Sequence, residues 1–246
     1  MVKFAVIIPA AGDSTRFQGS RYKKPFVELK GRAIWLRTVE HFVNRDDVSE
    51  VVMVLAQDDV EDFKWRFAAN LAFLPLTIAA GGATRAESVQ NGISQLAKPC
   101  EFIAVHDAAR PLLTKQWITE LFAAAEQRSA VIPATPVSST VKSVDAQGQI
   151  QKTVDRTSLM LAQTPQVFRR SILEDAYAAA DDPSAFTDEA SLVEASGVAV
   201  FVHPGWPMNI KITTQDDFQL AEALIGALPA GGGLQSLHPF DDERFR

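Results

Sequence analysis

The residues best suited to chemistry lie near the start of the chain, where a loop of small residues precedes a group of cations. The loop begins Pro9-Ala10-Ala11-Gly12, and its backbone N–H groups can point at an anion because small side chains leave the approach open. Residues 1–32 hold seven Lys or Arg and two acids, whereas the whole chain has a net charge of −6. The positive charge is therefore concentrated beside the loop, which predicts a site for a phosphate group.

This loop matches neither of the two commonest phosphate-binding motifs. No Gly-Lys-Ser/Thr follows it, as a P-loop requires, and the Gly-x-Gly-x-x-Gly spacing of a dinucleotide site is missing. The unbroken apolar run at 4–8 before it predicts a strand buried on both faces of a parallel sheet. Taken alone, the stretch also fits an ordinary strand and turn with no function.

Two later loops follow predicted strands in the same way. Gly81-Gly82 ends the strand at 76–80, and Asp107 and Arg110 follow the strand at 102–105. Because open α/β sheets bind ligands at the carboxyl ends of their strands, Asp107 is expected to face a ribose hydroxyl or Mg²⁺ and Arg110 a phosphate. The alternatives are that these two side chains pair with each other as a structural bridge, and that the glycines only form a tight turn.

The order of apolar runs and amphipathic stretches predicts an α/β protein with a Rossmann-like, mostly parallel, doubly wound sheet. Asp188 and Glu189 lie in the first turn of a helix that is predicted to begin after Thr187. The helix dipole favours acids there, so their presence has a structural explanation. Further helices are predicted at 33–43, at 58–70, at 114–128 with Thr114 as N-cap, at 171–180 with Ser171 as N-cap, from Thr187 as N-cap, and at 215–228. Further strands are predicted at 50–55, 130–133, 161–168, 198–202 and 209–213.

The alternation of strands and helices is interrupted by a polar stretch with β-branched residues, 137–156, which predicts a β-hairpin with its turn at 145–148. A hairpin with so few large apolar side chains has little to pack on its own, so it needs a partner surface. We expect it to form an arm that lies on a second subunit; the alternative is a hairpin folded back on its own domain. The stretch 229–246 contains three consecutive glycines and predicts a flexible tail.

Composition excludes several classes of protein. A pI near 5.3 argues against nucleic acid or an anionic membrane as the main partner, because either would need a basic face. No apolar run has the length of a membrane span and no signal peptide is recognisable, so a cytoplasmic location is expected. Cys100 is the only cysteine, and the four histidines lie too far apart in sequence to suggest a zinc site.

The motifs, taken in order over residues 4–217, resemble those of the 2-C-methyl-D-erythritol 4-phosphate cytidylyltransferases, a family of nucleotidyltransferases. The resemblance begins with Pro-Ala-Ala-Gly-x-x-x-Arg at 9–16 and Lys-x-Phe-x-x-Leu-x-Gly at 24–31. It continues through the segments at 81–92, 105–111, 140–142, 153–156, 163–166, 187–191 and 209–213. It implies transfer of CMP from CTP to the phosphate of a small polyol with release of pyrophosphate, Mg²⁺ as cofactor, and a homodimer in which the arm completes the neighbouring site.

The resemblance also implies roles for individual residues of the single domain 1–228. Because the attacking phosphate is already an anion, the reaction needs fixed cations rather than a general base. The implied catalytic cations are Arg16, Lys24, Arg156 and Lys211. The implied polyol-phosphate ligands are Arg110, Thr140, Thr164 and Thr187. The implied nucleotide-binding residues are Pro9, Ala10, Ala11, Gly12, Gly82, Ser88, Asp107 and Ala108, with Asp107 also the implied metal ligand.

Some choices stay open on the sequence. Lys23 or Lys24 could occupy the catalytic place, although the spacing to Gly31 favours Lys24. Ala83 stands where the family usually has a polar or acidic residue, so selectivity for cytosine could be looser. The rival functions are a cytidylyltransferase for another polyol phosphate such as ribitol 5-phosphate, a nucleotide-sensing module without catalysis, and, less favoured, a Rossmann dehydrogenase.

Overall fold

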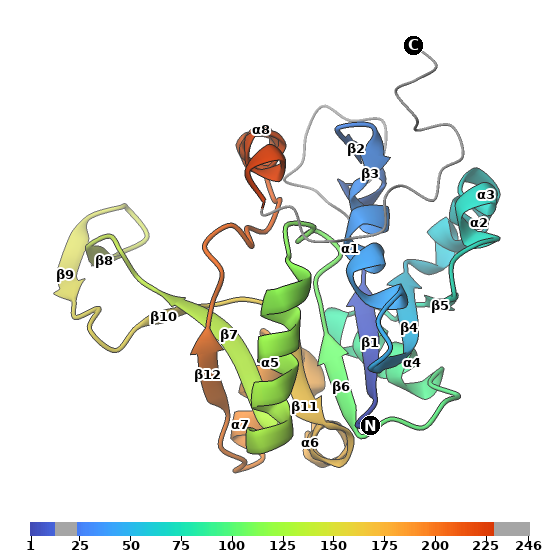
Figure 1. Ribbon diagram of the computed structural model, residues 1–246. Helices are drawn as coiled ribbons and strands as arrows, with labels where there is room; N and C mark the ends of the chain where they lie inside the picture. The colour runs from blue at the N-terminus through green and yellow to red at the C-terminus, as the bar shows by residue number, and fades with distance from the viewer. Residues whose placement is uncertain (13–23, 229–246) are drawn as a thin grey trace.

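The computed structural model describes residues 1–12 and 24–228 of the chain. In that part an eight-stranded sheet runs in the order β10-β7-β11-β6-β1-β4-β5, with β12 paired to the free side of β7 (Figure 1). The strands are β1 (Phe4–Pro9), β4 (Val48–Leu55), β5 (Leu76–Ala80), β6 (Phe102–Val105), β7 (Ala130–Pro136), β10 (Met160–Ala162), β11 (Gln166–Arg169) and β12 (Phe201–Pro204). Only β10 and β11 run antiparallel to their neighbours within this sheet, so the predicted mostly parallel α/β fold is confirmed.

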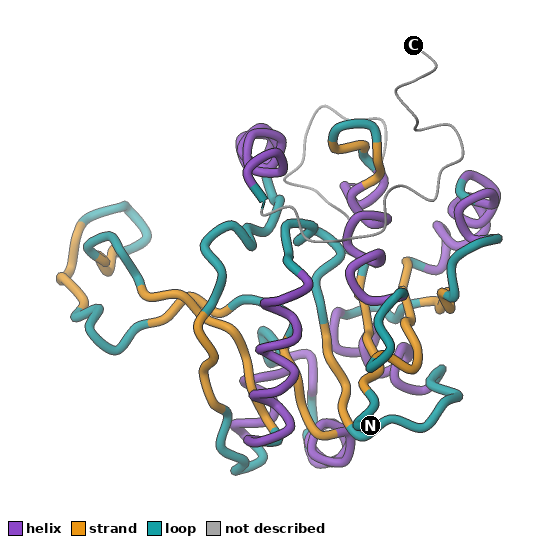
Figure 2. Tube along the Cα trace, viewed as in Figure 1, coloured by secondary structure: helices purple, strands orange, loops and turns teal. Residues whose placement is uncertain are grey.

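Helices cover both faces of the sheet (Figure 2). The helices are α1 (Ile34–Val43), α2 (Val60–Arg66), α3 (Ala68–Leu71), α4 (Arg85–Ser94), α5 (Lys115–Arg128), α6 (Arg170–Ala179), α7 (Glu189–Ala195) and α8 (Gln215–Leu224). Short 3₁₀ turns lie at Lys24–Phe26, Gln57–Asp59, Pro183–Ala185 and Ile225–Ala227. None of the helices in the described ranges combines the length and the apolar character that a membrane crossing requires.

The core explains why β1 reads as an unbroken apolar run. Val6 and Ile8 point into a cluster formed with α1, α2 and α5, whereas Ile7 between them points into the cluster formed with α4, α6 and α7. Successive side chains of a strand face opposite sides, so a central strand must be apolar at every position. β4 follows the same rule, with Met53 on the first face and Val52 on the second.

Several element predictions were wrong. The strand predicted at 161–168 is divided into β10 and β11, with residues 163–165 between them. The helix predicted at 58–70 breaks at Phe67, which leaves the helical conformation between α2 and α3. The strand predicted at 198–202 starts at Phe201, because pairing with Val131 on β7 sets its register while Val198 and Val200 pack into the core instead. Helix α6 begins at Arg170 with no side-chain cap, so Ser171 is not its N-cap.

The N-cap prediction for α7 was also wrong, because the N-cap is Asp188 and not Thr187. The Asp188 carboxylate accepts the Ser191 N–H at 2.9 Å, and the Ser191 hydroxyl oxygen accepts the Asp188 N–H. This capping box satisfies two backbone donors and places a negative charge at the positive end of the helix. Thr114 is the N-cap of α5 as predicted, because its hydroxyl accepts the Trp117 N–H at 3.2 Å.

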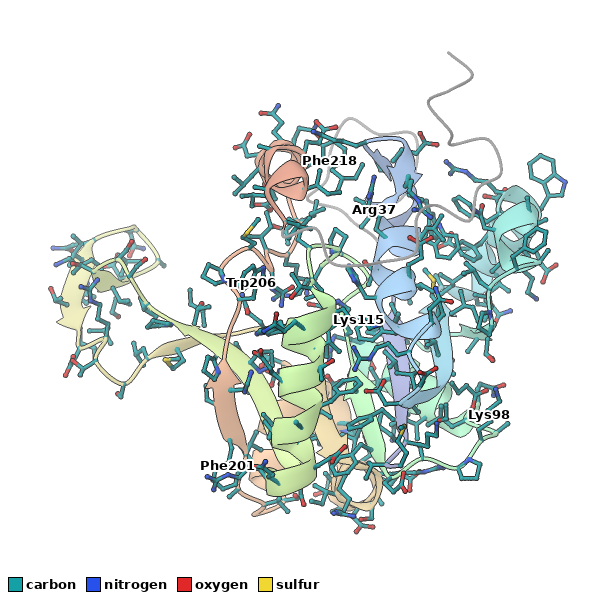
Figure 3. The ribbon with its side chains drawn as sticks, viewed as in Figure 1. Arg37, Lys98, Lys115, Phe201, Trp206 and Phe218 are labelled. Carbon is teal, nitrogen blue, oxygen red and sulfur yellow. The ribbon has the colours of Figure 1, made fainter. Side chains whose placement is uncertain are left out.

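The segment 209–213, predicted as a strand, pairs with no strand of the described structure. It belongs to the connection that leads from β12 past Trp206 to α8 (Figure 3). Asn209 and Ile212 fix it to the sheet edge, the latter by donating its N–H to the Ala109 carbonyl at 2.9 Å. The alternation of β-branched residues in 209–213 therefore arises because single residues are attached to the sheet edge, and not because the segment is a strand.

The predicted hairpin is confirmed as β8 (Val141–Val144) and β9 (Ile150–Val154), an antiparallel pair with Gly148 at φ +83° in its turn. It stands away from the main sheet at one side of the molecule (Figure 1). Val144 and Ile150 are more than half exposed there. A second small hairpin, β2 (Glu28–Leu29) with β3 (Arg32–Ala33), was not predicted.

Candidate active site

The carboxyl ends of the parallel strands meet at one edge of the sheet. β1 lies between β4, its successor in this sheet, and β6, which the chain reaches after returning from β5. Such a reversal of strand order opens a crevice between the loops that follow the two central strands, here β1 and β6. Because β11 runs in the opposite direction, its first residue, Gln166, pairs with Val105 at the end of β6 and belongs to the same edge.

The loops after β1 and β5 touch each other at this edge. A Cβ added at Gly81 would lie 3.1 Å from the Ala11 Cβ and 2.6 Å from the Ser88 Oγ, so only glycine permits this approach. At Gly82 the added Cβ would lie 2.4 Å from the Glu87 Cβ. The two glycines are thus required by close packing, which joins the predicted nucleotide-binding segments 9–12 and 82–88 into one surface.

Two of the predicted nucleotide-binding residues, Ser88 and Ala108, form hydrogen bonds within the protein. Ser88 Oγ accepts the Gly82 N–H at 3.2 Å and donates to the Thr84 carbonyl at 2.9 Å, so its own proton is used within the loop. Ala108 is buried, and its carbonyl accepts the Thr38 hydroxyl at 2.9 Å. These two residues shape the surface through their backbone and packing.

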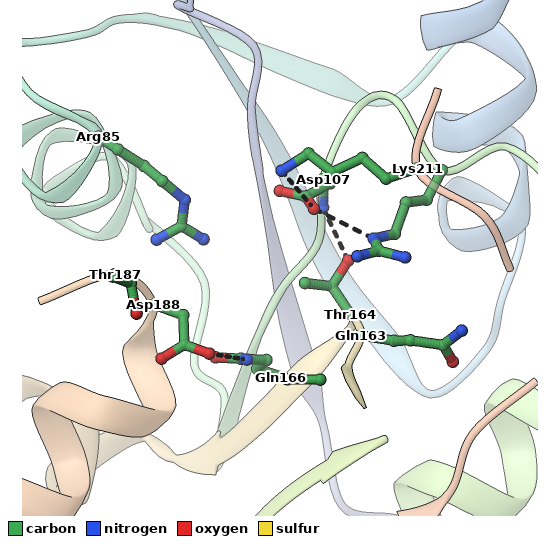
Figure 4. A pocket seen from close by; sticks show the side chains of 10 residues that line it. Arg85, Asp107, Gln163, Thr164, Gln166, Thr187, Asp188 and Lys211 are labelled. Carbon is green, nitrogen blue, oxygen red and sulfur yellow. Dashed lines mark hydrogen bonds and ion pairs between the residues drawn. The ribbon is translucent and has the colours of Figure 1, made fainter. Parts of the chain in front are cut away.

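A recess of about 130 Å³ lies beside this surface, at the ends of β6 and β11 (Figure 4). It contains five of the residues singled out from the sequence, which come from four separate segments of the chain. Its lining residues are Arg85, Asp107, Arg110, Ala162, Gln163, Thr164, Gln166, Thr187, Asp188 and Lys211.

Asp107 is the electrostatic centre of the recess. Its Oδ2 lies 3.0 Å from Lys211 Nζ and 3.1 Å from Arg110 Nε (Figure 4). Burial raises the pKa of Asp107, but the neighbouring charges of Lys211, Arg110 and Arg85 outweigh it and hold that pKa well below its ordinary value. Asp107 is therefore a carboxylate. The structural bridge between Asp107 and Arg110, left open on the sequence, is present.

Thr164 connects the recess to the buried ring of His106. Its Oγ1 accepts the Asp107 N–H at 3.1 Å and lies 2.9 Å from His106 Nδ1. His106 Nε2 lies 3.1 Å from the Arg110 carbonyl. Burial lowers the pKa of His106 to about 3, so the ring is neutral at pH 7. Asn209 adds an amide N–H to the Thr164 carbonyl at 2.8 Å.

The family model for 2-C-methyl-D-erythritol 4-phosphate cytidylyltransferase (IspD) matches residues 4–227. The chain belongs to this cytidylyltransferase family. As a member of it, the chain is a nucleotidyltransferase, an enzyme of isoprenoid-precursor synthesis, as the resemblance implied.

Individual cytidylyltransferases agree with this assignment. The enzyme of Alkaliphilus metalliredigens is 36% identical over 225 residues, which cover 91% of this chain and 93% of that one. The bifunctional enzyme IspD/IspF of Solidesulfovibrio magneticus is 39% identical over 246 residues, which cover 97% of this chain and 61% of that one. The crystal structure of the Francisella tularensis cytidylyltransferase has a TM-score of 0.76 at 29% identity and covers 90% of this chain and 99% of that chain.

Not every residue expected of a cytidylyltransferase lies in the recess. Thr140 and Arg156 belong to the arm, are exposed, and are absent from the lining; Arg156 Nη1 donates to the Ser138 carbonyl within the arm. Arg16 lies outside the described residues. Lys24 begins the 3₁₀ turn before β2, and its side chain is outside the described part.

The sequence interpretation missed an ion pair beside the recess, in which the carboxylate is buried. Arg85, the first residue of α4, donates Nη1 and Nη2 to the two carboxylate oxygens of Glu189 on α7 at 2.6 and 2.8 Å. The Tyr177 hydroxyl donates to the same carboxylate at 3.2 Å. Burial lowers the pKa of Arg85, but the charge of Glu189 outweighs it and raises that pKa above its ordinary value. This pair joins the nucleotide-loop helix to the helix that follows Thr187.

Two glutamines of the recess were also missed, although both lie in a quoted motif. Gln166 donates Nε2 to Asp188 Oδ2 at 2.8 Å and accepts the Ala190 N–H at 3.0 Å. Gln163 attaches the connection after β12 to the recess: its side-chain amide donates to the Trp206 carbonyl and its oxygen accepts the Trp206 backbone N–H. The only sequence signal for the two glutamines was their position beside Thr164, because the groups that they contact are distant in sequence.

The donor set for a metal is small. The part of the chain that the structure describes has no group of three or more His, Cys, Asp or Glu placed to hold an ion. The two ion pairs of Asp107 both use Oδ2, which leaves Oδ1 outside them. Mg²⁺ commonly binds one or two carboxylates and completes its shell with substrate phosphates and water, so Asp107 fits an ion carried largely by the nucleotide.

Proposed function

We propose that this chain transfers CMP from CTP to 2-C-methyl-D-erythritol 4-phosphate by positioning two anions between fixed cations. An oxygen of the polyol phosphate attacks the α-phosphorus of CTP, a new P–O bond forms, and the bond to the β-phosphate oxygen breaks to release pyrophosphate. The attacking oxygen carries no proton at pH 7, so the step needs no general base. The barrier is charge repulsion, which preorganised cations lower.

The observation that carries this proposal is the position of Lys211 and Arg110. Both contact Asp107 in a recess that adjoins the surface of 9–12 and 82–88. Asp107 orients the two cations before substrate arrives, so their orientation costs little during the reaction. Lys211 then contacts the incoming phosphate, while Arg110 and Thr187 contact the rest of the polyol phosphate.

The loop after β1 supplies the other half of the site. Pro9, Ala10, Ala11, Gly12, Gly82, Ser88 and Ala108 form the surface for the nucleotide, and Arg16 and Lys24 stabilise the α-phosphate and the leaving pyrophosphate. Mg²⁺ bound by Asp107 and the phosphates of CTP supplies additional positive charge there. These roles follow the cytidylyltransferase resemblance.

Turnover of two variants tests the cations of the recess. Lys211→Ala is expected to lower kcat by about 10²-fold or more, because one donor of a preorganised charge site is lost. Lys64→Ala is the matched control, since Lys64 lies on exposed α2 and pairs only with Glu61 among the described residues. A pyrophosphate-release assay with CTP and Mg²⁺ measures both. Parent-like turnover of Lys211→Ala would remove this residue from the mechanism.

The same assay discriminates between substrates. Methylerythritol phosphate is expected to be turned over in preference to ribitol 5-phosphate. The reverse preference would indicate the related cytidylyltransferase function, and absence of turnover with either polyol phosphate would indicate a sensing module.

We further propose a homodimer in which Thr140 and Arg156 of each arm reach the recess of the other chain. The arm and the segment 159–161 that follows it expose apolar residues that the described part of the chain does not cover, namely Val144, Ile150, Leu159, Met160 and Leu161. Burial of such a surface favours association. We also propose that residues 1–228 form one domain and that the protein is cytoplasmic. The predicted flexible tail at 229–246 lies outside the described residues.

Mixing two inactive variants tests the exchange of arms. Arg156→Ala and Lys211→Ala each lack one residue of every site in their own homodimers. After subunit exchange, half of the dimers contain one intact site out of two, so about a quarter of parental activity is expected. If both residues acted within one chain, mixing would restore nothing.

A further inference from the structure

Thr187 lines the recess, but no hydrogen bond holds its side chain there. The residue is exposed, and its hydroxyl forms no hydrogen bond with any residue in the ranges 1–12 and 24–228 (Figure 4). The position of this hydroxyl therefore depends on the backbone that carries it. That backbone continues directly into Asp188, the N-cap of α7. Whatever holds Asp188 consequently fixes where Thr187 meets a ligand.

A single buried side chain, Gln166, holds the start of α7 against the sheet. Gln166 is the first residue of β11 and is 1% exposed. Its Nε2 donates to Asp188 Oδ2 at 2.8 Å, and its Oε1 accepts the Ala190 N–H at 3.0 Å (Figure 4). The other oxygen of Asp188 accepts the Ser191 N–H at 2.9 Å. Gln166 thus binds both the N-cap side chain and one of the backbone donors that a helix start leaves without an intrahelical partner.

These two contacts determine which way the amide of Gln166 faces. A backbone N–H can only donate, so the amide oxygen is the atom that faces Ala190. The amide nitrogen then faces Asp188, whose carboxylate accepts its proton. A side chain that only accepts, or only donates, cannot make both contacts. The amide group, and not merely the size of the side chain, is therefore what position 166 requires.

The rest of the first turn of α7 is held from other elements. Arg85 on α4 and Tyr177 on α6 both contact the carboxylate of Glu189. In the described part of the chain, however, Gln166 is the only side chain outside α7 that forms a hydrogen bond with Asp188. Control over the residue next to Thr187 therefore lies with Gln166.

We infer that Gln166 is a positioning residue, which holds Asp188 so that the preceding Thr187 stays in place to contact the polyol phosphate. This inference rests on the proposed function, in which Thr187 is a substrate contact. Because Gln166 acts through Thr187, its loss should not weaken binding of the polyol phosphate by more than loss of the Thr187 hydroxyl does.

Exchange of the two hydrogen-bonding groups tests this role. In Gln166→Glu two carboxylates face each other, and in Asp188→Asn two amide nitrogens do. Combined, the two substitutions restore every contact with one hydrogen bond reversed in direction. Each single variant is expected to raise KM for the polyol phosphate by about tenfold with little change in KM for CTP, and the combination should return both to parental values. A combination as impaired as the single variants would overturn the inference, because Gln166 would then contact the substrate itself.

A Thr187→Val background separates positioning from direct contact. Thr187→Val alone is expected to raise KM for the polyol phosphate by about tenfold, and Gln166→Glu should add nothing to that loss. Additive losses would overturn the inference and leave the proposed reaction intact. Gln116→Glu is the matched control, since Gln116 donates to Glu120 at 2.9 Å on the exposed side of α5 and the variant should keep both parental KM values.

Crystal structures of the unliganded variants test the inference without turnover. The Thr187 hydroxyl is expected to leave its parental position in Gln166→Glu and to return to it in the combined variant. If Gln166→Glu does not fold, Asp188→Asn serves instead, because it keeps the acceptors for the Ser191 and Ala190 N–H groups. An unmoved Thr187 would overturn the inference whether or not the enzyme is active. A displaced Thr187 in a chain whose parent turns over no polyol phosphate would support the positioning and refute the proposed reaction.

Discussion

Removal of Arg85 should destabilise the protein far more than its partly exposed position suggests. The side chain of Arg85 is 35% exposed, but its partner Glu189 is only 1% exposed and holds both guanidinium nitrogens. In Arg85→Met the carboxylate of Glu189 stays buried, and among the residues that the structure describes only the Tyr177 hydroxyl remains as a side-chain donor to it. Breaking a buried pair from one side commonly costs 3–5 kcal/mol, and the partial exposure places this pair near the lower end, about 3 kcal/mol.

This loss can be measured by urea unfolding followed by circular dichroism, with thermal unfolding as a second readout. For a chain of this size, about 3 kcal/mol corresponds to a decrease in Tm of roughly 6–12 °C. Glu189→Leu combined with Arg85→Met should recover much of the loss, because apolar side chains replace both buried charges. The double-mutant cycle is expected to give a coupling energy of about 2 kcal/mol or more.

The exposed pair of Lys64 and Glu61 provides the control. Its members are 49% and 86% exposed at a separation of 3.1 Å, so the same cycle should give about 0.5 kcal/mol or less. If the two cycles gave equal coupling, burial of Glu189 would have no energetic consequence. The view of this pair as the connection between α4 and α7 would then be wrong.

Other predictions concern packing and pH. Gly92→Ala places a Cβ 2.7 Å from a methyl carbon of Ile7 and should cost about 1–3 kcal/mol in urea unfolding, whereas Gly226→Ala meets no atom within 4 Å and should be neutral. Burial lowers the pKa of His41, and that of His106 to about 3, so below pH 6.5 the unfolded chain binds more protons than the folded one. The free energy of unfolding should therefore fall by up to about 1.4 kcal/mol per pH unit for each histidine between pH 6.5 and 5.5, and a flat profile would contradict this.

The sequence predicted the sheet edge well because its signals are local. The apolar runs at 4–8 and 102–105 identify central strands, and parallel strands place the residues that follow them at one edge. Asp107 and Arg110 follow β6 and lie at this edge for that reason, whereas Thr164 and Lys211 were expected in the site from the family resemblance. The hairpin was predicted because a glycine between two alternating stretches is a local feature as well.

Features that depend on distant partners could not be predicted. Arg85 and Glu189 are 104 positions apart, and neither shows in the sequence that the other is near. The residues 209–213 alternate as a strand does, but they pair with no strand of the described structure. The N-cap of α7 was misplaced by one residue because Thr187 and Asp188 are both good caps, and only the position of Ser191 decides between them.

The unpaired connection after β12 links Lys211 mechanically to the last helix. Lys211 lies three residues before Thr214, the N-cap of α8, and one residue before Ile212, which is attached to the loop after β6. A ligand that draws the Lys211 ammonium group away from Asp107 acts on this short connection. The start of α8 is therefore coupled to whether the catalytic crevice is filled, and a probe placed on α8 is expected to report occupancy without contacting the reacting groups.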